Sequence, residues 1–372
     1  IVDGMVYAPN SDHYLYAIDT EGNLEWKFKA DGPNWTTPLA DELTLAAYEE
    51  GMKAGAHILM LNQVPGTREI FFKHASDEQL THISPIQKQM LETADCFLRI
   101  WADSNTRSLS GVDPKRMAQF GRANAEMSKI MMQRSATGDL RWCITVYPTN
   151  AMAQDADMSL ADYQEFVYGA GMLHEDDPVV FWEEEAARQR KLIEWMKGRK
   201  DVVIKGANVD ITMSIEGRTF IESAGTHNFP SGEVYASPVE DSVNGWVRFK
   251  YPAIHNGQEI HDIQLWFENG KVVKEEAAKN QELLTALLDT DEGARFLGEL
   301  GIGTNYGIQR FTKNMLFDEK IGGTIHLAVG AGFPEGGGKN ESGLHWDMLC
   351  DMSDGEIRVD GDLFYKDGKT VI

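Results

Sequence analysis

His345 and Asp347 stand two residues apart in the segment NESGLHWDMLCD, which occupies residues 340–351. In an extended strand, side chains at positions i and i+2 point to the same face. An imidazole and a carboxylate would therefore share one face, while the apolar residues around them fill the other. One interpretation is a buried hydrogen bond between the two side chains that stabilises the strand, and the other is a pair of metal ligands.

Three further segments place acids or a histidine beside glycines. NFPSGEVYASP contains Glu233, FLGELGIGTN contains Glu299, and FDEKIGGTIHLAVGAGF contains Glu319 and His326. Each residue also has a structural interpretation: Glu233 as a solvated turn residue, Glu299 as the end of a helix, Glu319 as a surface charge beside Lys320, and His326 as a hydrogen-bonded core histidine. The conjunction of the segments is what favours a metal site over these alternatives.

The charge and the donor types of the whole set indicate divalent cations. Four carboxylates and two neutral imidazoles carry a charge of −4, which two divalent ions would cancel. Neighbouring glycines allow tight backbone turns near an ion. Oxygen and nitrogen donors without a thiolate suit zinc, cobalt, manganese or magnesium. The sequence therefore predicts two divalent ions held by Glu233, Glu299, Glu319, His326, His345 and Asp347.

The same motifs, in the same order, carry a family resemblance. HNFPSGEVYASPVEDSVNG, FLGELGIGTN and FDEKIGGTIHLAVGAGFPEGGGKNESGLHWDMLCD resemble motifs of the aminopeptidase T/aminopeptidase S family of dinuclear metallo-aminopeptidases, from about Pro38 to the C-terminus. The resemblance implies an enzyme that acts on peptides and forms a homodimer around an enclosed chamber. It also implies a set of metal ligands, namely Glu233, Glu299, His326, His345 and Asp347, with Glu319 placed at the metals as well.

One position departs from the pattern of that family. Members of the aminopeptidase T branch carry a tyrosine seven residues after the first metal-binding histidine, and the resemblance implies that it assists catalysis. Here the position is occupied by Phe333. A phenyl ring cannot donate a hydrogen bond to a developing oxyanion. Either a metal ion or another donor takes this task, or the substrate range differs.

The favoured reaction is release of an N-terminal amino acid from a peptide by a metal-activated water at a dinuclear site. We expect Glu299 to bridge the ions and Glu319 to move the proton of the water. A rival hypothesis is a mononuclear non-haem Fe(II) ring-cleaving dioxygenase of the dihydroxypyridine type, with His326, His345 and Asp347 as its 2-His-1-carboxylate set. That site would leave Glu233 and Glu299 as buried acids without a metal.

Two kinds of pattern predict the elements that position these residues. Helical and strand patterns alternate over residues 39–207, which predicts an α/β domain with a mostly parallel sheet. In it the apolar run HILMLN, residues 57–62, is expected to be a buried strand. Strands joined by Asn-Gly and Asp-Gly turns follow over residues 208–372, interrupted by one helix near 280–288. They predict a β-rich α+β domain that binds the metals.

Residues 1–38 have a different sequence pattern from the rest of the chain. Their alternation of apolar and polar residues predicts two or three short antiparallel strands. They resemble one repeat of a quinoprotein-type β-propeller, but a lone blade cannot close a propeller. We expect a short β-rich extension of uncertain origin. A non-catalytic binding role for this extension is a third hypothesis, and deletion of the segment would test it.

Composition limits the class of protein. A chain of 372 residues favours two domains. The net charge of −23 argues against nucleic acid and anionic membranes as partners. The sequence has no run of about eighteen apolar residues, so we expect a soluble protein. Cys96, Cys143 and Cys350 fit no disulfide framework, which favours a reducing cytoplasm.

Overall fold

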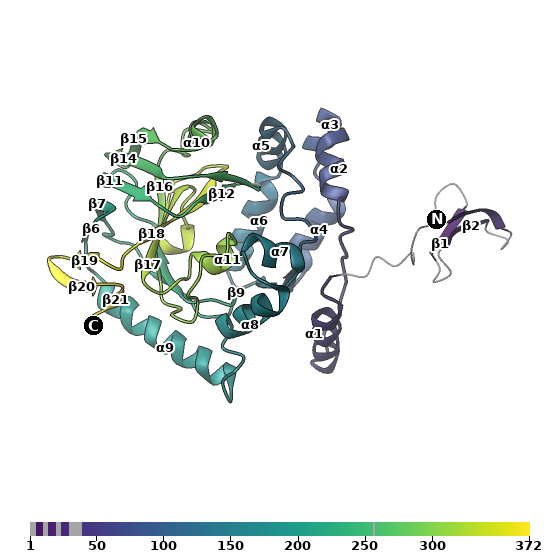
Figure 1. Cartoon of the computed structure of the whole chain (residues 1–372), viewed down its shortest axis with the longest axis horizontal. Coiled ribbons are helices and arrows are strands. Elements are labelled where there is room, and N and C mark those ends of the chain that lie inside the picture. Colours follow the sequence, from purple (N-terminus) through teal and green to yellow (C-terminus); the bar gives the residue numbers. More distant parts are fainter. Residues whose placement is uncertain (1–4, 10–13, 20–23, 30–38, 256) are drawn as a thin grey trace. The chain divides into compact units, whose positions relative to one another are not determined.

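The structure is a computed structural model that describes residues 5–9, 14–19, 24–29, 39–255 and 257–372. The chain divides into two compact units, residues 1–65 and 66–372. Figure 1 labels the helices and strands along the chain. The sequence predicts boundaries at residues 38 and 207 instead, and that division into folding domains stays a prediction.

The first unit contains a small sheet and one helix. Strands β1 (Met5–Pro9), β2 (Tyr14–Asp19) and β3 (Leu24–Lys29) form an antiparallel sheet in chain order, as the alternating pattern predicts. The residues that join them lie outside the described ranges. Helix α1 (Asp41–Lys53) follows, with acidic residues in its first turn and a lysine in its last.

The predicted strand at residues 57–62 is absent. The segment has no regular structure, and Leu59 and Leu61 are 70% and 64% exposed. In the part of the chain that the structure describes, it pairs with no strand. A short apolar run becomes a strand only where a neighbour satisfies its backbone hydrogen bonds. The prediction of a buried strand there was wrong.

The second unit begins with helices and a small parallel sheet. Strand β5 (Arg141–Val146) lies between β4 (Cys96–Trp101) and β9 (Asn228–Phe229), and both pairings are parallel, as predicted for the α/β part. The helices of this unit are α2 (Thr67–His74), α3 (Asp77–Thr81), α4 (Pro85–Thr93), α5 (Pro114–Ala123), α6 (Ala125–Ala136), α7 (Asn150–Asp155), α8 (Leu160–Ala170), α9 (Pro178–Met196), α10 (Gln281–Leu288), α11 (Met315–Asp318) and the short 3-10 helix η1 (Pro334–Gly336). No helix among the described residues combines the length and the apolar character needed to cross a bilayer.

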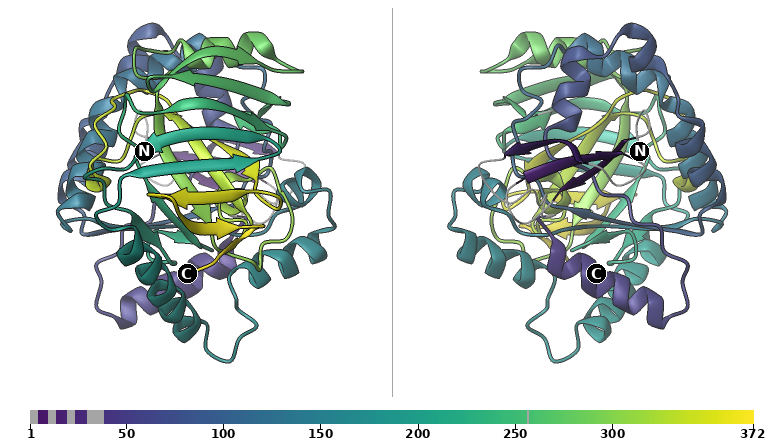
Figure 2. Two further views of the ribbon diagram at one scale, coloured as in Figure 1. Left: turned by 90° about the vertical axis from the view of Figure 1, so that its left-hand side faces the viewer. Right: turned by 90° about the vertical axis from the view of Figure 1, so that its right-hand side faces the viewer.

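Two antiparallel sheets make up the rest of the unit. The five-stranded sheet has the order β18 (His345–Asp351), β17 (Thr324–Gly330), β16 (Leu297–Gly303), β10 (Glu233–Ala236), β8 (Ile221–Ser223). The eight-stranded sheet has the order β15 (Lys271–Glu276), β14 (Ile263–Glu268), β11 (Asn244–Phe249), β7 (Val209–Ser214), β6 (Asp201–Gly206), β19 (Glu356–Val359), β20 (Asp362–Lys366), β21 (Lys369–Thr370). A hairpin of β12 (Ala253–His255) and β13 (Gln258–Ile260) completes the strands. Figure 2 (left) shows the eight-stranded sheet in front of the five-stranded one.

Two-residue turns of the predicted Asn-Gly and Asp-Gly types set the strand register in the eight-stranded sheet. Asn269 and Gly270 join β14 to β15 with φ angles of 48° and 82°. Asp360 and Gly361 join β19 to β20 with 52° and 86°. Two successive positive φ values match the type I′ turn, whose twist fits a two-residue hairpin. These Asn-Gly and Asp-Gly pairs confirm the hairpins that the sequence predicts.

The principal core lies between the two antiparallel sheets and fixes which face of the smaller sheet is polar. Val234 on β10, Leu300 and Ile302 on β16, and Ile325 and Leu327 on β17 are at most 1% exposed and belong to one hydrophobic cluster. Burying each such side chain contributes roughly 1.5–3 kcal/mol. Because alternate residues face opposite ways, a slip of one residue would bring the other face of these strands into the core.

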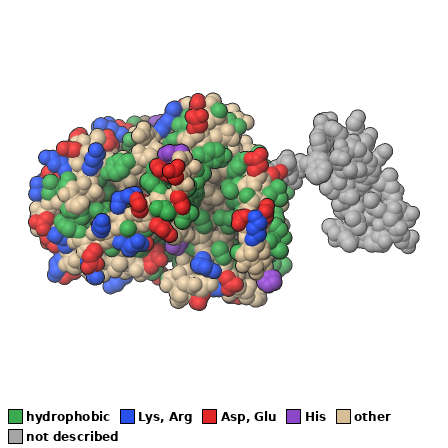
Figure 3. Space-filling model, turned by 90° about the horizontal axis from the view of Figure 1, so that it is seen from below, with side chains coloured by type: hydrophobic (Ala, Val, Ile, Leu, Met, Phe, Trp, Pro, Cys, Tyr) green, Lys and Arg blue, Asp and Glu red, His purple; other side chains and the backbone are tan. Residues whose placement is uncertain are grey.

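The outer surface of the described residues mixes charges of both signs. On the face in Figure 3, Lys and Arg side chains are interspersed with Asp and Glu, and no continuous basic patch covers the described part of that face.

Candidate metal centre

The face of the five-stranded sheet that points away from the core carries the predicted ligands. Glu233 starts β10, Glu299 lies on β16, His326 on β17, and His345 and Asp347 on β18. Their strands are neighbours in the sheet order β18-β17-β16-β10. His345 and Asp347 therefore share one face of the sheet, as their i, i+2 spacing predicts, because both stand on a strand.

Small residues separate the ligands across the strands. Glu233 pairs with Gly303, and His326 pairs with Gly301. Gly330 pairs with His345. A Cβ at position 301 would lie 1.8 Å from Nε2 of His326, so the imidazole occupies the space of a missing side chain. The glycines near the acids thus provide room over the sheet, in addition to turns.

The ligand atoms form two groups that share one residue. Atoms of Glu233, Glu299 and His326 lie within 4.8 Å of one another, and so do atoms of Glu299, His345 and Asp347. Glu299 faces both histidines, with Oε1 3.4 Å from Nε2 of His326 and Oε2 3.1 Å from Nε2 of His345. Its two oxygens are therefore directed to different groups.

The tautomer of His345 leaves a lone pair for the cluster. Its Nδ1 lies 2.8 Å from the carbonyl oxygen of Ala331, and because a carbonyl can only accept, Nδ1 carries the proton. In the neutral ring, Nε2 then presents a lone pair to carboxylate oxygens of Glu299 and Asp347. Lone pairs that face each other repel, so a proton or a cation must lie between them.

Two buried polar atoms of the cluster have no hydrogen-bond partner among the described residues. They are Oδ1 of Asp347 and Nδ1 of His326. An unpaired carboxylate oxygen away from water costs free energy unless a proton or a cation satisfies it. The donor set of three carboxylates and two imidazoles fits zinc, cobalt or manganese well. The residues present therefore fit divalent metal ions.

The pKa of each side chain in the cluster is shifted by burial and by the charges of its neighbours. Burial raises the pKa of Glu233 to about 7 and that of Asp347 to about 6. Burial also acts against ionisation of Glu299, but hydrogen bonds from both histidines outweigh it and lower its pKa to about 2. Burial lowers the pKa of each histidine, and the neighbouring carboxylates reverse this and raise the pKa values of His326 and His345 to about 10. In the absence of metal ions, the two histidines thus bind protons at the positions that divalent cations could occupy.

Glu319 stands beside the cluster and belongs to neither group of ligand atoms. It follows α11, and its Oε1 contacts Nζ of Lys320. The same Nζ lies 3.3 Å from Oε1 of Glu233, and the Lys320 side chain is 0% exposed. Glu319 is therefore linked to the ligands through a buried ammonium group.

Lys320 is the residue that sequence reasoning missed. The sequence offers a surface pair with Glu319 as the simple interpretation, whereas the structure buries the lysine completely. Burial acts to lower the pKa of Lys320, but the charges of Glu233 and Glu319 raise it above the ordinary value. The signal available in the sequence was weak: Lys320 stands four residues before the mostly apolar segment TIHLAVG, residues 324–330.

Phe333, which occupies the position of the family tyrosine, lies beside the cluster. Its ring centroid is 5.1 Å from that of His345, at an angle of 73°. On its other side it contacts the ring of Tyr235 at 4.9 Å. The phenyl group therefore lines the same face of the sheet as the ligands.

Comparison with known proteins gives one family and a consistent set of relatives. The profile of the family described as thermophilic metalloprotease (M29) matches residues 31–371. Aminopeptidase 2 of Geobacillus stearothermophilus is 29% identical over 383 residues, which cover 91% of this chain and 89% of the relative. Aminopeptidase T of Thermus thermophilus is 27% identical over 300 residues, which cover 71% and 72%. No propeller was found, so the resemblance of residues 1–38 to a propeller repeat is not confirmed.

A solved structure shares the fold. The wild-type AmpT of Thermus thermophilus superposes with a TM-score of 0.75 and covers 89% of this chain and 92% of its own, at 22% sequence identity. At this sequence identity the match shows that the two chains share a fold over most of their length.

Proposed function

The chain belongs to the M29 family of thermophilic metalloproteases, and from this premise we propose that its ligand cluster binds two divalent ions joined by Glu299. It is a metallo-aminopeptidase, related to aminopeptidases 2, S and T. The observation that carries the proposal is the membership of Glu299 in both groups of ligand atoms. A carboxylate whose two oxygens face different ligand groups suits the bridging position of a two-metal site.

Each ion would have its own ligands besides the shared one. Glu233 and His326 would complete the first site, and His345 and Asp347 the second. Lys320 changes the charge balance, because with its ammonium group and the carboxylate of Glu319 the cluster carries −3. One divalent ion would leave a net charge of −1 in this buried place, and a second would bring the net charge to +1.

Bound divalent ions would supply the activation of a water molecule and the polarisation of the scissile carbonyl. The protein residues would position the ions and transfer the proton. Glu299 and the two histidines would fix the position of the site on a rigid sheet. Glu319, whose Oε1 contacts the ammonium group of Lys320, would accept the proton of the attacking water on Oε2 and pass it to the leaving amine. The products are a free amino acid and a peptide shortened by one residue.

The dioxygenase hypothesis is not favoured. The family is a peptidase family, and the two histidines fall into different groups of ligand atoms, each with Glu299. A mononuclear iron site at His326, His345 and Asp347 would also leave Glu233 and Glu299 as buried acids, 4% exposed each. No observation on the described residues favours ring cleavage over hydrolysis.

The experiment uses the full chain, treated with a chelator and then reloaded with Zn²⁺, Co²⁺, Mn²⁺ or Mg²⁺ in parallel. Release of p-nitroaniline from aminoacyl p-nitroanilides is expected to vanish on chelation and to return with at least one of these ions. The same substrate with an acetylated amine is the control, because an aminopeptidase requires the free amine. Equal hydrolysis of the acetylated substrate, or full activity in the metal-free protein, would overturn the proposal.

A pair of variants separates the site from the sheet that carries it. Glu299→Gln removes the charge of the shared ligand and keeps its volume. Glu222→Gln on neighbouring β8 alters an acid that pairs with Arg190 at 3.1 Å. We expect the first variant to lose activity at every metal concentration and the second to keep it.

Finer expectations from the sequence, concerning the metal, the oligomeric state and the cellular compartment, remain proposals here. We propose zinc or cobalt as the resident ions, a homodimer, and a cytoplasmic enzyme. Elemental analysis of protein purified without added metal tests the first, and light scattering coupled to size-exclusion chromatography tests the second. Cell fractionation tests the third.

A further inference from the structure

Tyr235 stands on the same face of the sheet as the metal ligands. It is two residues after Glu233 on β10, and side chains at that spacing share a face. Across the strands it pairs with Gly301, the residue over which the imidazole of His326 lies. The phenol therefore belongs to the wall of the site, although no sequence motif marked it.

A row of three rings connects this phenol to a proposed metal ligand. The ring of Tyr235 lies 4.9 Å from that of Phe333, and the ring of Phe333 lies 5.1 Å from that of His345. Phe333 is thus packed directly between the phenol and the imidazole. The hydroxyl group that is missing at position 333 is present on the adjacent ring, that of Tyr235.

The hydroxyl of Tyr235 makes a contact that a substrate could replace. It donates to Oε1 of Glu335 at 3.4 Å, which is long for an O–H···O hydrogen bond. Glu335 is exposed, and Tyr235 is half-buried. The hydroxyl of Tyr235 is therefore a donor whose present hydrogen bond is weak.

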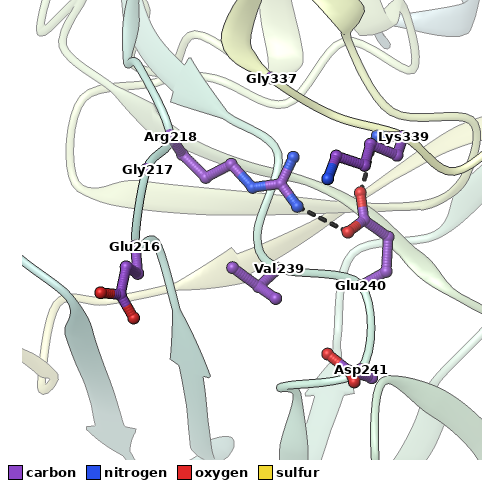
Figure 4. Close-up of a pocket in the computed structure, with 8 residues that line it drawn as sticks. All are labelled: Glu216, Gly217, Arg218, Val239, Glu240, Asp241, Gly337 and Lys339. Atoms are coloured by element: carbon purple, nitrogen blue, oxygen red, sulfur yellow. Dashed lines mark hydrogen bonds and ion pairs between the residues drawn. The ribbon is translucent and has the colours of Figure 1, made fainter.

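The loop that carries Phe333 and Glu335 is tied down at both ends. The backbone N–H of Phe333 donates to Oγ of Ser237 at 2.8 Å. At the other end the N–H of Lys339 donates to Oε1 of Glu240 at 2.7 Å. The second oxygen of Glu240 accepts from Arg218 at 2.6 Å, and Figure 4 shows these three side chains together. A donor is effective in catalysis when its surroundings are preorganised in this way.

We propose that Tyr235 is a catalytic residue whose O–H donates a hydrogen bond to the carbonyl oxygen of the scissile peptide bond as negative charge develops on it. It would perform the task that Phe333 cannot. The inference rests on the proposed aminopeptidase function and assigns the donor within that same site. No covalent bond forms to the phenol, and Tyr235 keeps its proton throughout.

The test compares Tyr235→Phe with the parent holoenzyme. Loss of one preorganised donor to an oxyanion lowers kcat by about 10²–10³-fold, and KM is expected to change little. Metal content per chain, measured by elemental analysis, should equal that of the parent. Tyr365→Phe is the matched control. The hydroxyl of Tyr365 on β20 is buried and has no hydrogen-bond partner among the described residues, so this substitution should leave kcat unchanged.

A second readout distinguishes a donor from a structural residue. Binding of an α-aminophosphonate that mimics the tetrahedral intermediate should weaken by about the same factor as kcat, while binding of the free product amino acid stays within a few-fold. In the double variant Tyr235→Phe, Phe333→Tyr the hydroxyl is moved to the adjacent ring, and recovery of at least tenfold in kcat is expected.

Two results would overturn the assignment. One is a kcat of Tyr235→Phe within twofold of the parent at full metal occupancy. The other is an equal loss of affinity for the aminophosphonate and the product, which indicates a structural role. Failure of the proposed function itself is distinguishable, because the parent holoenzyme would then release no amino acid from any peptide.

Discussion

The imidazole of His326 lies over Gly301, on the neighbouring strand of the five-stranded sheet. The two residues pair between β17 and β16, and a Cβ at position 301 would lie 1.8 Å from Nε2 and 2.0 Å from Cε1 of the ring. No side chain can occupy this position while the ring keeps its place. The glycine therefore determines where the imidazole of one proposed metal ligand can lie.

Gly301→Ala is expected to displace His326 and to weaken the first metal site, with loss of roughly 10–100-fold in affinity for one of two ions. The fold should persist, because alanine in a strand interior is intrinsically favoured over glycine by roughly 0.5–1 kcal/mol. Isothermal calorimetry with the chelated protein measures the affinity. Gly169→Ala, where a Cβ meets nothing within 4 Å, is the control and should leave both affinities unchanged. Unaltered metal affinity in Gly301→Ala would contradict this, because it would show that the imidazole of His326 can move aside without loss of metal binding.

The buried ammonium of Lys320 is expected to matter most when no metal is present. Lys320→Met leaves Glu233 and Glu319 without their cation, and breaking a buried ion pair costs roughly 3–5 kcal/mol. Urea unfolding of the chelated protein should show this loss, and added divalent ions should recover part of it by neutralising the same carboxylates. Lys197→Met, whose partner Glu194 is exposed, is the control with little effect. An equal, small effect of both substitutions would place Lys320 in contact with solvent.

Glu259 predicts a pH dependence at a place away from the metal ligands. Hydrogen bonds from Arg107, and then from His261, hold the pKa of its carboxyl at about 2, below the ordinary 4.5. Since the folded pKa is lowered, the carboxylate contributes stability above pH 4.5, and this contribution is lost as the pH falls towards 2. The difference in unfolding free energy between the parent and Glu259→Gln should therefore be constant above pH 4.5 and shrink below it.

Chelated protein is the appropriate material for that titration, because metal release would otherwise add its own pH dependence. Arg107→Met should give the same shape, since it removes the strongest partner of Glu259, at 2.9 Å. A difference that stays constant down to pH 2 would mean that the carboxylate is not stabilised by these partners in the folded state.

Local patterns predicted much of the site because the site lies on strands. His345 and Asp347 share a face through the period of two in a strand, and Glu299 and His326 were found through neighbouring glycines. The tight turns at Asn269-Gly270 and Asp360-Gly361 follow from local backbone preference. These inferences need no knowledge of which strands are neighbours.

Features that depend on tertiary neighbours could not be predicted. The apolar run at residues 57–62 looks like a strand, yet it is exposed and unpaired in the described structure. Lys320 looks like a surface lysine, and only the fold brings Glu233 to it. Tyr235 carries no motif, and its relation to Phe333 arises from a loop nearly a hundred residues away in sequence.

The most direct test of the account is the number of divalent ions bound per chain in four proteins, measured by elemental analysis after reloading and desalting. The account predicts about two in the parent, about one in Glu233→Gln, about one in Asp347→Asn, and fewer than one in Glu299→Gln, because Glu299 alone belongs to both groups of ligand atoms. One ion per chain in the parent, retained in Glu233→Gln and Glu299→Gln, would contradict the shared carboxylate and the dinuclear site together.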